Sequence, residues 1–166
     1  FYHNNIRNGS SNASSKAFYS TYGGNLNFVN NIAAHEGTGY AIYATGTSSY
    51  ASSDYNDLFT AGVNVGFWNG TNQLNLPDWQ VASSLDWNSI SIDPSFTAAD
   101  DLHVSQIALD SAGTVLASVT DDIDGEARNA THPDIGADEF GAAVTDDIGI
   151  SAVTAPVDDC DLSDNE

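Results

Sequence analysis

The most informative stretch is Val29-Asn30-Asn31-Ile32, because related patterns stand at His3-Asn4-Asn5-Ile6 and at Tyr55-Asn56-Asp57-Leu58. The three copies are 26 residues apart, and each ends on Ile or Leu. A fixed period in this range is typical of proteins that stack one small unit on the next. The sequence therefore predicts a β-solenoid of about 26 residues per coil.

The residues around the second copy alternate as those of a half-buried strand do. Side chains of Leu26, Phe28, Asn30 and Ile32 would share one face, which is mostly apolar and should point inward. A lone buried amide is costly, whereas identical amides on neighbouring strands hydrogen-bond to one another. We therefore predict a structural ladder of inward-facing amides, made of Asn4, Asn30 and Asn56.

The pattern changes after residue 72, which suggests three parts. We expect parallel coils over 1–72, the last coil or coils and an irregular cap over 73–141, and a linker or first strand of a further module over 142–166. A short helix is predicted from Leu76 to Ala82, with Pro77 in its first turn and Asp78 near its positive end. Trp79 would anchor this helix.

The charge is strongly acidic, with three basic against 23 acidic residues and a net charge of −20. Such a chain repels phosphate backbones, which argues against nucleic acid as a partner. No apolar run reaches the length of a membrane span, so we expect no membrane insertion. The chain opens on Phe1 and contains no Met, so we expect it to be a piece of a longer protein.

The acidic C-terminal half offers candidate metal ligands. Alternating oxygen donors followed by Gly125 suggest a Ca²⁺ site, although the spacing is not that of an EF-hand. The alternative is a metal-free cap in which Arg128 bonds Asp134 or Asp138. The four histidines lack the i, i+4 spacing of a helical zinc site. The candidate Ca²⁺ ligands are Asp121, Asp122, Asp124, Asp134 and Asp138.

Aromatic residues suggest a surface for sugars. Tyr40, Tyr43, Trp68 and Trp87 are candidates for a glycan-stacking platform, and the alternative is that they pack in the core or cap. No catalytic residue is predicted. On the coils, Asp54 and Asp57 are the candidate carboxylates for catalysis, and Cys160 has no nearby histidine to activate it.

Seven short motifs occur in an order that resembles one family. These motifs are SDYNDL (53–58), GFWNGT (66–71), DWQ (78–80), IDPSF (92–96), DLHV (101–104), DIDGEAR (122–128) and DIGADEF (134–140). Residues 1–141 are similar to the end of the right-handed parallel β-helix domains of large secreted and surface proteins of gliding and related bacteria. The resemblance implies an extracellular or cell-surface location, type IX export, and immunoglobulin-like modules downstream, of which residues 147–153 would begin the first.

Two functions follow as hypotheses. The first is a non-enzymatic extracellular or cell-surface scaffold or adhesion module that contacts polysaccharides, other surface proteins or the remainder of the same polypeptide. The alternative is the C-terminal portion of a β-helix polysaccharide lyase or glycoside hydrolase. A uronate-cleaving enzyme would need positive charge on the coils, where only Arg7 and Lys16 are available.

Overall fold

The computed structural model describes residues 1–21, 24–46 and 50–141. Short strands dominate these residues, with one α-helix and one turn of 3₁₀-helix. The elements are β1 (Asn5–Asn8), β2 (Lys16–Ser20), β3 (Leu26–Val29), β4 (Ile32–His35), β5 (Tyr40–Ala44), β6 (Tyr50–Asp54), β7 (Asp57–Thr60), β8 (Gly66–Trp68), β9 (Thr71–Gln73), α1 (Leu76–Ser83) and η1 (Ile107–Leu109).

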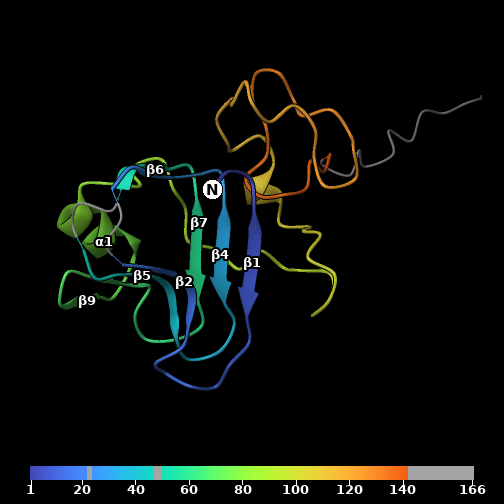
Figure 1. The fold of residues 1–166 in the computed structure, drawn as a ribbon. Helices are drawn as coiled ribbons and strands as arrows, with labels where there is room; N and C mark the ends of the chain where they lie inside the picture. Colours follow the sequence, from blue (N-terminus) through green and yellow to red (C-terminus); the bar gives the residue numbers. More distant parts are fainter. Residues whose placement is uncertain (22–23, 47–49, 142–166) are drawn as a thin grey trace, which may run out of the picture.

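The strands form three small sheets, which the chain visits in the same order each time. One sheet pairs β1, β4 and β7 in parallel, and the three strands stand side by side in Figure 1. The second pairs β2, β5 and β8 in parallel and ends on antiparallel β9, and the third pairs β3 with β6 in parallel. The fold is therefore all-β with one short helix, and its sheets are small, mixed in one case, and not closed on themselves.

The register shows that the spacing between equivalent residues is not constant. Asn5 pairs with Ile32, and Ile32 pairs with Asp57, so successive steps are 27 and 25 residues. The predicted period of 26 residues is the mean of these two steps. This difference of one residue changes which side chains face inward, because neighbouring residues of a strand point to opposite faces.

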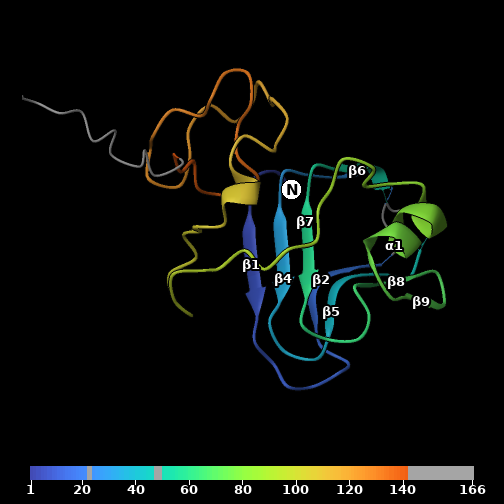
Figure 2. The same cartoon turned by 180° about the vertical axis from the view of Figure 1, so that it is seen from behind.

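Two apolar cores hold the described residues together. The first lies between the three sheets and α1, and residues such as Phe28, Ile42 and Leu58 are fully buried there. The second lies where the chain after α1 covers the outer face of the β1-β4-β7 sheet, and it includes Ile32 and Ile135. Figure 2 shows the segment after α1 crossing in front of this sheet. The C-terminal half thus depends on the strands for its core.

The predicted helix is confirmed and ends one residue later than expected. The side chain of Asn75 caps it by accepting a hydrogen bond from the backbone amide of Asp78. Trp79 is fully buried and meets Trp68 edge to face, with ring centroids 5.3 Å apart. A Cβ at Gly66 would lie only 2.6 Å from the Trp79 ring, so the close approach of α1 to β8 requires glycine there.

The chain from residue 84 to 141 is mostly irregular. The alternation of Ile90 and Ile92 with polar residues predicts another short strand over residues 89–94, but the structure has a single bridge there, between Ile90 and Asp57. Among the described residues, no helix has the length and apolar character needed to cross a membrane. The predicted strand at 147–153 and Cys160 lie outside the described residues.

Candidate functional site

The structure contains a ladder of buried amides, but its middle member is Asn31, so the prediction of Asn30 was wrong. Asn4 Nδ2 donates to Asn31 Oδ1 at 2.8 Å, and Asn31 Nδ2 donates to Asn56 Oδ1 at 3.2 Å. The backbone amides of Asn4 and Asn31 donate to the same two oxygens. Each amide side chain therefore links one strand set to the next.

Asn30 instead occupies a bend and ties the C-terminal segment to the strands. Like His3 and Tyr55 at the equivalent positions, it has a positive φ, which asparagine tolerates better than most residues. Its side chain donates to the Thr114 carbonyl at 2.6 Å and to His3 Nε2 at 2.8 Å. His3 Nδ1 then donates to the Gly136 carbonyl. Burial and the nearby Arg128 charge lower the pKa of His3 to about 4, so this imidazole is neutral.

The ladder continues past Asn56 and ends on a buried carboxylate. Ser89 Oγ accepts from the Asn56 backbone amide at 2.8 Å, and Asp86 Oδ1 accepts from Asn56 Nδ2 at 2.9 Å. Asp86 also accepts from Ser53 Oγ and from the Trp79 indole. Burial raises the pKa of Asp86, and these donors oppose that shift. This part of the molecule is a polar connection inside the core, out of reach of a ligand.

An aromatic row lies on the outer face of the β2-β5-β8 sheet. Tyr19 pairs with Tyr43, and Tyr43 pairs with Phe67, so the three rings are in register on parallel strands. Tyr43 is stacked on Phe67 with centroids 4.2 Å apart, and Tyr40 meets Tyr43 edge to face at 5.2 Å. We call Tyr19, Tyr40, Tyr43 and Phe67 the aromatic row.

The four aromatic residues predicted to bind glycans do not form one platform. Tyr40 and Tyr43 belong to the aromatic row, whereas Trp68 is buried and packs in the core. Trp87 is 60 % exposed in the loop after α1. Tyr19 was not among the predicted residues, although it is 54 % exposed. Its alternation with buried Phe18 in the sequence was the signal that could have identified it as outward-facing.

Within the row, the rings differ in how much face they offer. Lys16 Nζ lies 4.6 Å from the Tyr43 centroid and 5.6 Å from that of Tyr19, and Phe67 covers Tyr43 by stacking. Tyr19 has its ring at 61° to that of Tyr43 and is the most exposed member of the row. The Tyr40 hydroxyl donates to Asn72 Oδ1 at 3.0 Å. A flat ligand would therefore meet Tyr19 first.

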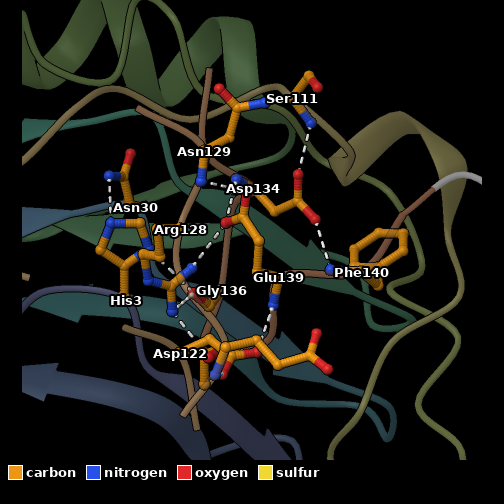
Figure 3. A network of polar contacts seen from close by, with 12 residues as sticks. His3, Asn30, Ser111, Asp122, Arg128, Asn129, Asp134, Gly136, Glu139 and Phe140 are labelled. Carbon is orange, nitrogen blue, oxygen red and sulfur yellow. Dashed lines mark hydrogen bonds and ion pairs between the residues drawn. The ribbon is translucent and has the colours of Figure 1, made fainter. Parts of the chain in front are cut away.

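Two of the predicted calcium ligands are occupied by the protein's own backbone (Figure 3). Asp122 accepts three backbone amides at 2.7 to 3.1 Å, and Asp134 accepts two at 2.6 and 2.8 Å. Burial raises the pKa of Asp134 to about 6. These carboxylates hold the irregular segment together, so the five predicted residues do not form one calcium site. The donors belong to Ser111, Asp124, Glu126, Glu139 and Phe140.

Arg128 is the central cation of the same network, but its partners differ from those predicted. Its guanidinium donates to Glu139 Oε2 at 3.2 Å and to the carbonyls of Gly136 and Ala137 at 3.1 and 2.7 Å. The side chain is only 5 % exposed. These contacts go to neither Asp134 nor Asp138, so Arg128 fixes the backbone around residues 136–139.

Two other predicted calcium ligands, Asp124 and Asp138, lie close to His103, which was not among the predicted ligands. Side-chain ligand atoms of His103, Asp124 and Asp138 lie within 4.8 Å of one another. His103 Nε2 is 2.9 Å from Asp124 Oδ2, and His103 Nδ1 is 2.5 Å from Asp101 Oδ1. These two carboxylates raise the pKa of His103 to about 9. Asp121 is exposed and lies outside this group.

A cleft of about 550 Å³ opens beside this cluster. Its walls include His103 and Asp101 on one side, Asn4 and Asn5 before and in β1, and Arg128 from the C-terminal network. The cleft therefore joins the start of the chain to the acidic segment, which are more than 90 residues apart in sequence.

The two carboxylates considered for catalysis are used structurally. Asp54 accepts from the backbone and side-chain amides of Asn88, both at 2.7 Å. Asp57 is fully buried, accepts from the Ile92 amide and has its pKa raised well above the usual value by that burial. Comparisons with protein-family models, curated proteins and solved structures found no match.

Proposed function

We propose that the chain is part of a right-handed parallel β-helix that serves as a non-enzymatic scaffold outside a bacterial cell or on its surface. Three sheets with parallel pairing, visited repeatedly in one order, support this architecture. Parallel strands joined by crossovers are almost always connected in the right-handed sense. Amide ladders between successive strand sets support it further.

We further propose that the aromatic row is a glycan-contact surface of this scaffold. The observation that carries this proposal is the exposed Tyr19 ring, in register with Tyr43 and Phe67 on an outer sheet face. Aromatic rings with hydroxyl groups offer apolar area to the C–H face of a sugar and hydrogen bonds to its edge. Tyr19 and Tyr40 provide both kinds of contact.

The charge of the chain favours a neutral polysaccharide over an acidic one. A net charge of −20 repels uronates and sulfated sugars. Among the described residues, Lys16 is the one cation in contact with the row, and it already lies over Tyr43 and Tyr19 and donates to the Ser14 carbonyl. Neutral hexose polymers are therefore the ligand class that we propose.

Binding to insoluble polysaccharides tests this function. The chain should be retained by at least one of cellulose, chitin, mannan or starch, and less by polygalacturonate. Tyr19→Ala should weaken that retention about tenfold, because one aromatic–sugar contact is worth on the order of 1.4 kcal/mol. Pull-down isotherms measure both quantities.

Trp87→Ala is the matched control, because it removes an equally exposed aromatic ring outside the row. Equal losses for both variants, or no retention of the unmodified chain, would remove the glycan proposal. Release of reducing ends or unsaturated uronates from the same polymers would instead favour the enzyme alternative and overturn the scaffold.

A further inference from the structure

We propose that His103, Asp124 and Asp138 bind one divalent transition-metal ion of the zinc class. This site is separate from the aromatic row and does not depend on glycan binding. It joins one imidazole nitrogen and two carboxylates from three separate segments of the irregular C-terminal half.

The three ligand atoms already converge. They lie within 4.8 Å of one another, which small side-chain adjustments would bring to the spacing of ligands around one ion. Sequence separations of 21 and 14 residues between the three ligands mean that folding, and not a local turn, places them together. This distinguishes the set from a run of acidic residues on one exposed loop.

The imidazole is oriented as metal-bound histidines commonly are. His103 Nδ1 is directed at Asp101 Oδ1, which leaves Nε2 on the side of Asp124. A carboxylate on the second ring nitrogen fixes the orientation of a ligating histidine and increases its basicity. Asp101 is therefore a positioning residue for this site.

Asp138 gives an independent reason to expect a cation. Its side chain is only 7 % exposed, yet the interactions that favour its charged form are one backbone hydrogen bond from Val104 and the His103 charge. An ionised carboxylate can accept about four hydrogen bonds, so most of this buried group's capacity is unused. A bound cation would use part of that capacity.

The ligand chemistry favours zinc-class ions over Ca²⁺. Calcium prefers six to eight oxygen ligands, whereas one imidazole and two carboxylates match Zn²⁺ or Mn²⁺ with water completing the shell. Asp122 and Asp134, which would have added oxygens, are engaged with backbone amides. The cleft beside His103 provides a route for water and ion.

Thermal unfolding with added metal tests the site. Chelator-treated chain should gain about 5 °C or more in Tm with Zn²⁺ at a hundredfold excess over its Kd. Isothermal titration should give one Zn²⁺ per chain. His103→Gln and Asp138→Asn should each abolish the gain. Because the His103 side chain is 41 % exposed, His103→Gln should leave the Tm of the metal-free chain nearly unchanged.

Matched controls are His132→Gln and Asp121→Asn, which change an exposed histidine and an exposed carboxylate outside the cluster. Both should keep the full Zn²⁺ response. The proposal is overturned if Zn²⁺ leaves the Tm unchanged, or if the gain survives in His103→Gln. It is also overturned if Ca²⁺ alone stabilises the chain and Asp121→Asn removes that effect.

Discussion

Asp57 is a buried acid whose cost can be measured. Its Oδ2 atom has no hydrogen-bond partner among the residues that the structure describes, and burial raises its pKa well above 3.8. The protonated Asp57 carboxyl stabilises the folded state fully when the pH is below the pKa that this group has in the unfolded chain. That stabilisation is lost as the pH rises through the higher pKa of the folded state. Asp57→Asn should therefore be more stable than the unmodified chain at pH 7, by about 1 to 3 kcal/mol, and nearly equal at pH 4.

Urea unfolding at the two pH values measures this difference. The exposed carboxylate variant Asp100→Asn serves as control and should show no such pH-dependent gain. An Asp57→Asn advantage that is the same at both pH values would mean that ionisation of Asp57 is not its cause.

The ladder illustrates how far single residues could be predicted. The repeated four-residue motifs correctly indicated that amides stack, and Asn4 and Asn56 are members of the amide ladder. The error at Asn30 arose because equal spacing was assumed, whereas the real steps are 27 and 25 residues. A register change of one residue reverses every side chain, so an average period cannot distinguish Asn30 from Asn31.

Between strands, the ladder should contribute measurably to stability. Both the backbone amide and the side-chain Nδ2 of Asn4 donate to Asn31 Oδ1. Asn31→Ala removes this shared acceptor, so both Asn4 donors lose that partner. Unsatisfied buried groups cost about 1 to 3 kcal/mol each, so we expect a loss of about 3 kcal/mol in the free energy of unfolding.

Asn56→Ala should cost at least as much, because Asn56 also bonds the Phe28 carbonyl and Asp86. Ser52→Ala, which removes one partly buried contact to Asn27, is the control and should cost less than 1 kcal/mol. Denaturant unfolding compares the variants, and an Asn31→Ala loss no greater than that of the control would contradict a stabilising ladder.

Helix α1 shows the kind of element that local sequence predicts well. Asn75, Pro77 and Asp78 act within one turn, so their signals do not depend on distant contacts. The strand expected around Ile90 failed for the opposite reason. That segment makes one bridge to Asp57 and otherwise packs by side chains, which alternation alone cannot reveal.

At the scale of the molecule, Arg128 should control how the C-terminal segment is held. Arg128→Met removes a buried guanidinium, so Glu139 Oε2 and the carbonyls of Gly136 and Ala137 each lose one donor. Breaking a buried ion pair costs about 3 kcal/mol or more. Backbone amides over 119–140 should then exchange with solvent deuterium much faster, whereas those of β5 should change less.

Lys16→Met, which removes a cation on the opposite sheet, is the matched control for this experiment and should leave exchange over 119–140 unaltered. Equal acceleration in all strands and in 119–140 would show that the C-terminal segment and the sheets unfold as one unit.

The C-terminal network could not have been predicted from sequence. Gly136 meets Asn5 and Ile32 closely, and His3 bonds its carbonyl across 133 residues of chain. No local pattern carries information over such separations. The composition did indicate an acidic, irregular segment after the strands, but its partners depend on how that segment lies across the β1-β4-β7 sheet.

The direction of the amide ladder has an electrostatic consequence. Asn4 donates to Asn31, Asn31 to Asn56, and Asn56 to Asp86, so every dipole in the series points the same way. Aligned peptide dipoles at a helix start favour negative charge in the same manner. The Asp86 carboxylate thus lies at the positive end of a row of aligned side-chain dipoles. Each further amide added with the same orientation would strengthen the electric field at that carboxylate.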